Sequence, residues 1–173
     1  MVNRDFASRG ARKVLLTDIT YLFYAGWRCY LSTILDAVTH EILAWQVSES
    51  LEVQFVLDTV DALLDLHGAT LDNMTIVHSD QGCHYTSRAF IAKLKDAAFV
   101  QSMSRKGNCI DNAATEQVFG HLKDEFHAGR EFASYEQFKN ELDAYIIHWN
   151  TKRRQIRLEG HTPEEFRNMS LTA

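Results

Sequence analysis

Three acidic residues occupy positions where a carboxylate could take part in chemistry rather than serve solubility. Asp18 lies inside the apolar stretch 14–23, where an unpaired charge is costly to bury. Asp80 follows a second apolar stretch, and Glu116 falls on the polar side of a predicted helix. Converging carboxylates repel one another unless a cation shares the site, and a hard divalent ion such as Mg²⁺ suits their oxygens. The joint placement of the three acids therefore favours a shared metal site.

Such a site would act on phosphodiesters. Two ions about 3.5 to 4 Å apart can activate an attacking water or hydroxyl and stabilise the leaving oxygen, which is the chemistry of nucleases and of strand transfer. Each acid alone has a simpler interpretation, because an Asp at a strand end is more commonly a turn or cap residue. We interpret Asp36 as structural and Asp111 as a helix cap. We interpret His78 as a hydrogen-bonded strand residue, because Mg²⁺ prefers oxygen ligands.

The first half of the chain favours an antiparallel arrangement followed by a helix. Residues 14–23, 29–35 and 41–47 are rich in residues that favour strands, and their close spacing predicts an antiparallel meander. Ser50 is expected to cap a helix, which Gly68 ends.

The middle of the chain favours parallel strands. Residues 74–79 and 99–103 predict two short strands, joined by a helix that Thr86 or Ser87 caps. Strand–helix–strand order implies parallel pairing, and the carboxyl end of a parallel strand commonly opens into a ligand site. Asp80 is expected at such an end.

Three more helices are predicted after a polar loop at 105–108. The first has an apolar stripe on one side and a more polar face on another. The stripe consists of Ala114, Val118, Leu122 and Phe126. The polar face consists of Glu116, Gly120, Lys123 and His127. A capping box of Ser134 and Gln137 starts a long helix, and Pro163 starts a short one. The predicted fold class is therefore α/β.

Length and composition suit one globular domain. The chain has 173 residues, of which 46% are hydrophobic and one is Pro. We expect a single domain over residues 1–173, with an N-terminal arm at 1–12 and a C-terminal basic segment and short helix at 150–173. No apolar run approaches the roughly 18 to 20 residues that cross a bilayer, and the polar start does not resemble a signal peptide. We therefore expect a cytoplasmic protein with no membrane partner.

Charge and cysteines add weaker expectations. The three cysteines are odd in number and form no Cys-x-x-Cys, so free thiols are expected. The net charge of −5 argues weakly against nucleic-acid binding. However, no Lys or Arg lies between Arg28 and Arg88, and the basic residues gather at 9–13, 88–106 and 152–157. A basic surface beside an acidic one fits this pattern, and so do the solvated faces of an ordinary acidic protein.

Three stretches of sequence carry a family resemblance. Residues 16–21 (LTDITY), 78–87 (HSDQGCHYTS) and 102–113 (SMSRKGNCIDNA) closely resemble the catalytic core of bacterial insertion-sequence transposases. The match is to the family usually made by frameshifting between two overlapping reading frames. Asp80 and Glu116 are separated by 35 residues, as in the Asp-Asp-35-Glu class shared with retroviral integrases. The resemblance runs from about residue 3 to residue 167.

The resemblance implies a ribonuclease H-like fold with a mixed five-stranded sheet, three antiparallel strands and flanking helices. It implies that Asp18, Asp80 and Glu116 are catalytic and hold two Mg²⁺ ions, for which Mn²⁺ can substitute. The implied reaction is nicking at the 3′ ends of the element, followed by attack of the freed 3′ hydroxyl on another phosphodiester, without a covalent enzyme intermediate. The implied partners are DNA, further copies of the chain on DNA, and the bacterial nucleoid.

Two features depart from complete members of that family. No helix-turn-helix or zinc-binding segment precedes residue 3, so recognition of the element's ends is expected from a separate N-terminal region or a partner polypeptide. The family signature of an aromatic residue and Asn followed by Arg is present as Trp149, Asn150 and Arg153. Many members have His where this chain has Gln155, and no role of that His is carried over.

Several residues are candidates for DNA contact. Arg105 and Lys106 lie on the loop with Gly107, and Lys123 lies two turns after Glu116, so we expect phosphate contacts from all three, with solvated surface charge as the alternative. Asn112 could orient Glu116, touch substrate or cap its own helix.

The other DNA-contact candidates have structural alternatives of their own. Arg153 and Arg154 could grip DNA or pair with acids such as Glu164 and Glu165. Tyr85 could stack on a base, although a packed loop aromatic is the more common case.

Three functions fit these features. The first is a transposase catalytic domain, which the presence of all three acids favours. The second is a catalytically inactive or domesticated remnant of the same fold that binds DNA or dimerises. The third is a plain nuclease, which a hydroxyl-acceptor assay would separate from strand transfer.

Overall fold

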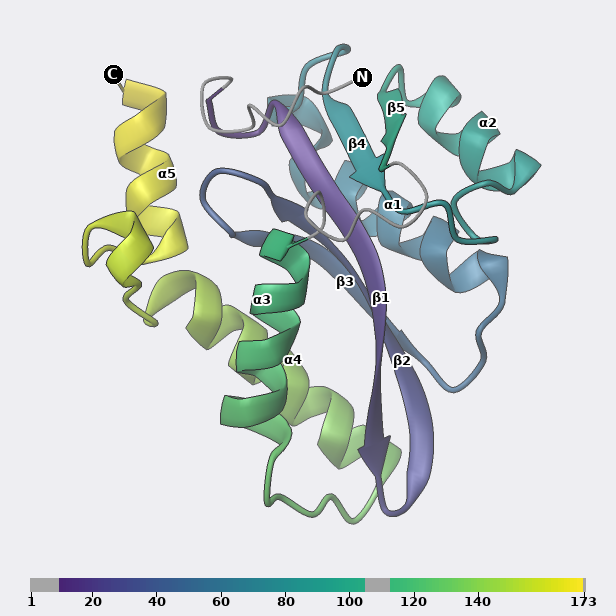
Figure 1. Ribbon diagram of the computed structural model, residues 1–173, viewed down its shortest axis with the longest axis vertical. Helices are drawn as coiled ribbons and strands as arrows, with labels where there is room; N and C mark the ends of the chain where they lie inside the picture. Colours follow the sequence, from purple (N-terminus) through teal and green to yellow (C-terminus); the bar gives the residue numbers. More distant parts are fainter. Residues whose placement is uncertain (1–9, 105–112, 173) are drawn as a thin grey trace.

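A computed structural model describes residues 10–104 and 113–172, and the structural statements below concern these ranges (Figure 1). The strands are β1 (Val14–Tyr24), β2 (Trp27–Asp36), β3 (Ile42–Ser48), β4 (Ile76–Ser79) and β5 (Val100–Met103). The helices are α1 (Val53–His67), α2 (Arg88–Asp96), α3 (Ala113–Leu122), α4 (Tyr135–Thr151) and α5 (Pro163–Thr172). Short helical turns are η2 (Gly68–Thr70), η4 (Lys123–His127) and η5 (Ile156–Leu158).

The strands form one mixed sheet in the order β3-β2-β1-β4-β5. β1 pairs antiparallel with β2, and β2 pairs antiparallel with β3. β4 pairs parallel with β1 and with β5. The predicted fold class, with three antiparallel strands followed by two parallel ones, is confirmed.

The β1–β2 hairpin is longer than expected. Tyr24 pairs with Trp27 across a two-residue turn, in which Ala25 and Gly26 have φ angles of 46° and 81°. Two positive φ angles are typical of the tight turns that match the twist of paired strands. Because β4 pairs with β1 only as far as Leu16, the rest of β1 forms an edge of the sheet on that side.

Each face of the sheet is covered by its own helices (Figure 1). Alternate residues of β1 point to opposite faces. Val14, Leu16 and Leu22 pack in the core made with α3 and α4. Leu15 packs in the core made with α1 and α2. Asp18 follows the alternation of Leu16 and Leu22, so it belongs to the face that α3 covers.

The predicted helix starts are confirmed in part. The hydroxyl of Ser87 accepts the N–H of Phe90 at the start of α2, as predicted. Ser134 likewise caps α4, but the side chain of Gln137 accepts the N–H of Ala133 rather than that of Ser134. The prediction for Ser50 is wrong, because α1 has Glu52 at its N-cap with no side-chain hydrogen bond.

The predicted apolar stripe of α3 packs in the core as predicted, and the buried face is wider than predicted. The buried residues of α3 are Thr115, Val118, Phe119 and Leu122, which follow the spacing of one helix face. Phe126 is also buried, but it lies in the π-helical turn η4, which changes the register after Leu122. Ala114 is only partly buried.

The family signature on α4 has a structural role. The indole of Trp149 donates to the carbonyl of His40 (2.9 Å). Asn150 accepts the N–H of Ile42 (2.9 Å) and donates to its carbonyl (2.8 Å). Next to this contact, buried Asp36 accepts the N–H groups of Val38 (2.7 Å) and Thr39 (2.9 Å). These bonds attach the end of α4 to the β2–β3 connection, and Asp36 is structural as predicted.

Two further sequence predictions concern membrane spans and cysteines. None of the helices in the described ranges is long and apolar enough to cross a membrane. Cys29 and Cys83 are free thiols, as predicted, and Cys109 lies outside the described residues. Burial raises the pKa of the Cys29 thiol to about 12.

Candidate active site at the ends of β1 and β4

Asp18 and Asp80 stand level on neighbouring parallel strands. Leu16 pairs with His78, the last pair of the ladder between β1 and β4. Asp18 lies two residues after Leu16, and Asp80 lies two residues after His78. Since neighbouring strands lie about 4.8 Å apart, both carboxylates emerge at the same end of this ladder. The sequence predicted this strand-end position for Asp80.

Each carboxylate is held by backbone close to it. Oδ1 of Asp18 accepts the N–H of Ile19 (2.8 Å), and Oδ1 of Asp80 accepts the N–H of Gly82 (2.8 Å). A Cβ atom added at Gly82 would stand 2.9 Å from that Asp80 oxygen, so a glycine allows the close approach. The amide of Gln81 donates to the carbonyl of Ser104 (3.0 Å) and ties this turn to the end of β5. The turn after β4 therefore orients Asp80.

Tyr85 is buried in the core that α1 and α2 form with the sheet, and does not lie on the surface. Its side chain is 2% exposed and lies edge-on to Phe90, with ring centroids 5.2 Å apart. Burial raises the pKa of Tyr85 well above its usual value, and the charges of Asp18 and Asp80 raise it further. Both carboxylates thus lie within electrostatic reach of one hydroxyl. The expectation that Tyr85 stacks on a base is corrected, because the buried ring offers no face for one.

Glu116 lies in the first turn of α3, beside its buried stripe. Its side chain is exposed, and α3 packs on the face of the sheet to which Asp18 belongs. Within residues 10–104 and 113–172, no group of three or more His, Cys, Asp or Glu residues lies close enough to hold a metal ion. The structure therefore brings Asp18 and Asp80 to one edge and does not gather all three acids into a metal-binding cluster.

The predicted basic contacts are engaged with the protein itself. Nε of Arg153 donates to Glu125 (2.8 Å), and its guanidinium lies 4.5 Å from the ring centroid of Trp149. Arg154 pairs with Glu165 at 3.3 Å, the alternative that the sequence left open. Lys123 places its ammonium 4.9 Å from the ring centroid of Tyr21.

Three further predicted contacts belong to the stretch between β5 and α3. Arg105, Lys106 and Asn112 lie outside the described residues, as does Asp111. His78 bonds through Nδ1 to the hydroxyl of Ser102 (3.0 Å) on β5, as expected for a hydrogen-bonded strand residue.

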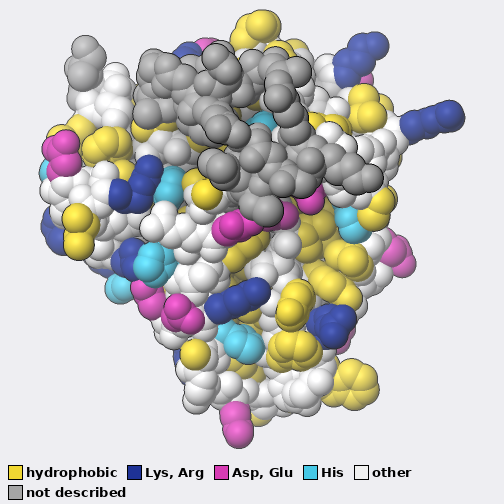
Figure 2. Space-filling view, in the orientation of Figure 1, with side chains coloured by type: hydrophobic (Ala, Val, Ile, Leu, Met, Phe, Trp, Pro, Cys, Tyr) yellow, Lys and Arg dark blue, Asp and Glu magenta, His cyan; other side chains and the backbone are white. Residues whose placement is uncertain are grey.

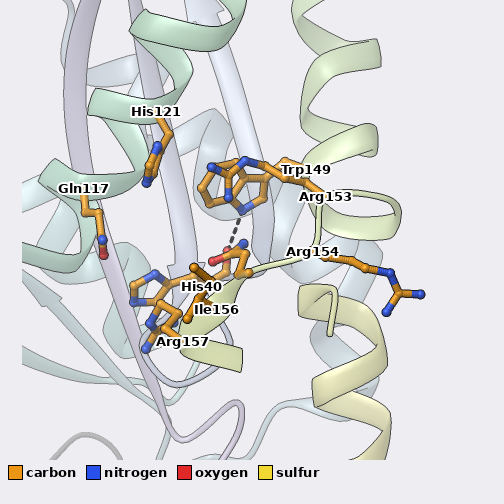
Figure 3. Close-up of a pocket in the computed structure, with 9 residues that line it drawn as sticks. His40, Gln117, His121, Trp149, Arg153, Arg154, Ile156 and Arg157 are labelled. Carbon is orange, nitrogen blue, oxygen red and sulfur yellow. Dashed lines mark hydrogen bonds between the residues drawn. The ribbon is translucent and has the colours of Figure 1, made fainter. Parts of the chain in front are cut away.

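Sequence reasoning missed a cavity of about 310 Å³ between α3, the end of α4 and η5 (Figure 3). Gln117 and His121 line it from α3, and His40 and Arg157 line it from the other side. Arg157 makes no hydrogen bond or ion pair with any described residue, whereas Arg153 and Arg154 both do. Gln155, which also lines the cavity, is 6% exposed and its Nε2 has no hydrogen-bond partner in the described ranges. The signal in the sequence was the replacement of the family's His by Gln155.

Two solved structures with this architecture are integrase cores. The catalytic core domain of BIV integrase aligns with a TM-score of 0.69 at 19% identity, over 93% of this chain and 97% of that one. The HTLV-2 integrase catalytic core domain aligns with a TM-score of 0.63 at 13% identity. The fold is therefore that of the ribonuclease H-like integrase cores.

Sequence comparison identifies the family. A family model described as "Integrase core domain" matches residues 9–109, and a second model with the same description matches residues 116–171. The chain belongs to the integrase core domain family, on the branch of the insertion-sequence transposases.

Two relatives illustrate this branch. An uncharacterized transposase-like protein of Haemophilus influenzae is 36% identical over 99% of this chain and 78% of its own length. A protein of Escherichia coli named as a transposase of insertion sequence element IS150 is 35% identical over 98% of this chain. The chain spans 59% of the length of that Escherichia coli relative.

Proposed function

We propose that the chain is the catalytic core of an insertion-sequence transposase, which nicks DNA at the element's 3′ ends and joins the freed 3′ hydroxyl to another phosphodiester. The observation that carries the proposal is the level placement of Asp18 and Asp80 beyond the last pair of the β1–β4 ladder. Membership of a family whose relatives are named as transposases supports it. The presence of all three acids makes an inactive remnant the less favoured alternative.

The acids fit a magnesium site in their chemistry. Asp18, Asp80 and Glu116 offer carboxylate oxygens, which Mg²⁺ and Mn²⁺ prefer, and the HTLV-2 integrase core was solved in complex with magnesium. Bound there, a pair of such ions would supply an activated nucleophile and stabilise the leaving oxygen. Asp18 and Asp80 would hold the ions from the sheet, and Glu116 would complete the site from α3. Glu116 lies in the first turn of α3, which begins directly after a segment, 105–112, that lies outside the described residues.

The residues around the acids would orient them. The N–H of Gly82 fixes one oxygen of Asp80 and leaves the other for a ligand. Tyr85 and Phe90 pack in the core on the other face of the sheet and support the strands that carry the two acids. These contacts are the protein's own contribution to the geometry of an in-line displacement.

DNA would be bound by cations around this edge. We keep Arg105, Lys106, Asn112, Lys123, Arg153 and Arg154 as proposed contacts. Arg157 joins them as the better candidate at the C-terminal end, because it carries no ion pair with a described residue and lines the cavity in Figure 3. Arg153 and Arg154 would have to exchange Glu125 and Glu165 for phosphate.

The remaining partners follow from the relatives. Since the chain spans 59% of the Escherichia coli relative, recognition of the element's ends would come from a further N-terminal region or a partner polypeptide. The HTLV-2 core was solved in a dimeric form, and we propose that copies of this chain also assemble on DNA. The reaction would take place in the bacterial cytoplasm, on nucleoid DNA.

The test is nicking of a labelled duplex that carries the end of the encoding element, with Mg²⁺ or Mn²⁺. The wild type is expected to nick the duplex and to join the freed 3′ hydroxyl of the labelled strand to a target DNA. The variant Asp80→Asn is expected to do neither. Asp96→Asn is the matched control, because Asp96 is exposed at the end of α2 and has no hydrogen bond or ion pair within the described ranges. Equal activity of the wild type and Asp80→Asn would refute the assignment of Asp80, and hydrolysis without joining would indicate a plain nuclease.

A further inference from the structure

An aromatic and basic surface lies on the outer half of the β1–β2 hairpin. Tyr21 and Phe23 are 53% and 39% exposed, and their rings meet edge to face with centroids 5.9 Å apart. They lie two residues apart on one strand, so they share a face of the hairpin. Arg28 pairs with Phe23 across the hairpin and shares that face.

Two cations are held on these rings. The guanidinium of Arg28 lies 5.5 Å from the centroid of Tyr21 and 5.7 Å from that of Phe23. The ammonium of Lys123 lies 4.9 Å from Tyr21. Neither cation forms an ion pair with an acid in the described ranges. Figure 2 shows basic and hydrophobic side chains next to one another on the lower half of the molecule, over β1 and the end of α3.

This surface lies near the acids along both β1 and α3. Tyr21 is three residues beyond Asp18 on β1, which is roughly 10 Å at the rise of a strand, and its side chain leaves the opposite face of β1 next to the free edge. Lys123 is seven residues beyond Glu116, which is roughly 10 Å along a helix. Lys123 reaches Tyr21 at the edge of β1 that β4 leaves free. A strand of DNA whose phosphodiester lies at the acids would reach the surface within about three nucleotides.

The chemistry of the surface fits unpaired nucleotides. Exposed aromatic rings beside cations are what proteins use to bind single strands, because every base can stack on a ring and every phosphate meets a positive charge. The bases of a duplex already stack on each other, so a duplex offers this surface phosphates alone. Phe23 also lines a cavity of about 630 Å³ with His127, Arg130 and Glu131, in which Arg130 is already paired with Glu141.

We propose that Tyr21, Phe23, Arg28 and Lys123 form a stacking surface for unpaired bases of the DNA strand beside the cleaved phosphodiester. The inference rests on the proposed function, since it takes DNA as the substrate. It adds a preference for a locally single-stranded end, which the three acids do not explain. Joining of an end with unpaired bases next to the reactive phosphodiester would then be faster than joining of a fully paired end.

The test measures binding without metal. A fluorescein-labelled thymidine oligomer of about 12 nucleotides, within the usual footprint of single-strand binders, is titrated with the full chain in EDTA. The variant Tyr21→Leu/Phe23→Leu is expected to bind at least about 5-fold more weakly, since one stacked base contributes 1 kcal/mol or more. Tyr21→Phe keeps the ring and is expected to bind as the wild type does.

Matched controls separate stacking from folding and from charge. Trp27→Leu removes an aromatic side chain that is 70% exposed but pairs with Tyr24, on the opposite face of the hairpin, and should leave binding unchanged. Arg28→Gln and Lys123→Gln should each reduce the slope of log affinity against log salt by about 0.7, whereas Lys95→Gln on α2 should not. Circular dichroism and thermal unfolding confirm that each variant is folded.

The results that overturn the inference are distinct from failure of the proposed function. If the chain binds the oligomer and the leucine double variant binds it equally well, the stacking surface is refuted, whatever the nicking assay gives. If sedimentation shows that the double variant loses a self-association while binding is unchanged, the surface contacts a second copy instead. Ring-dependent binding by a chain that fails to nick would support the surface and refute the catalytic proposal.

Discussion

The contact between Gly82 and Asp80 allows a substitution that moves a carboxylate without removing it. In Gly82→Ala the new Cβ would stand 2.9 Å from Oδ1 of Asp80, and 3.6 Å from Cγ. Ordinary contact begins at about 3.4 Å, so the two groups must separate by about 0.5 Å. Gly82 does not have a positive φ, so alanine itself is not strained there. The flexible carboxylate will move, because the backbone of the turn is tied to β5 through Gln81.

The displacement should affect catalysis more than stability. A misplacement of about 1 Å can cost about 100-fold in rate, so about 0.5 Å predicts roughly a 10-fold loss of nicking. The weakened hydrogen bond from Gly82 costs about 1 kcal/mol, and the smaller conformational entropy of an unfolded alanine offsets about 0.4 to 1 kcal/mol. The thermal midpoint should therefore change little. Nicking rates and Mn²⁺ affinity, measured on the same preparation, test both parts.

Gly120→Ala provides the control. Gly120 lies on the exposed side of α3, and a Cβ there would meet nothing within 4 Å. Alanine in a helix is favoured over glycine by about 0.5 to 1 kcal/mol, so this variant should be more stable and should nick at the wild-type rate. If Gly82→Ala also nicked at the wild-type rate with unchanged Mn²⁺ affinity, Asp80 would not be acting from the position argued here.

Three further predictions concern stability. Asn150→Ala should lower the free energy of unfolding by about 2 to 4 kcal/mol in urea titrations, because it leaves the N–H and carbonyl of Ile42 without their partner. Burial lowers the pKa of His40 from 6.5 to about 3. Between these pH values the unfolded chain binds a proton that the folded chain does not, so the free energy of unfolding should fall as the pH drops through this range. His40→Gln should flatten that decline, and equal slopes of stability against pH in the wild type and the variant would refute the assignment. Arg153→Ala should destabilise the protein by about 1 to 2 kcal/mol, and Arg154→Ala by less than about 0.5 kcal/mol. The reason is exposure, because the Arg153 side chain is 20% exposed and the Arg154 side chain is 65% exposed. A larger loss of thermal stability in Arg154→Ala than in Arg153→Ala would contradict this.

The order of the elements could be predicted because each one has a local signal. Strand-forming stretches, the cap at Ser87 and the cap at Ser134 depend on neighbouring residues alone, and the structure has these elements. The strand-end position of Asp80 could also be predicted, because strand–helix–strand order implies the parallel pairing of β4 with β5. The role of Glu116 as the third metal ligand stays a prediction, because the described residues do not gather all three acids into one cluster.

The partners of the basic residues could not be predicted, because they depend on packing between distant elements. Arg153 meets Glu125, which the π-helical turn η4 places against the end of α4. Nothing near either residue in the sequence indicates that contact. The aromatic surface was missed for a similar reason. Strand alternation gives Tyr21 and Phe23 a common face. Whether that face is exposed depends on where the helices pack, and in the described ranges both rings remain exposed.

The shortness of β4 connects the fold to the proposed reaction. β4 has four residues and β1 has eleven, so β1 continues beyond Asp18 without a neighbour on that side. An unpaired strand edge is a hazard, because it can pair with other chains. Here Nε2 of His127 lies 3.1 Å from the N–H and 2.8 Å from the carbonyl of Phe23, and so covers part of the edge with a side chain. A longer β4 would close this edge beyond Asp18. In the proposed reaction a DNA strand would approach the acids along the same edge, so access for substrate offers a reason for the short β4.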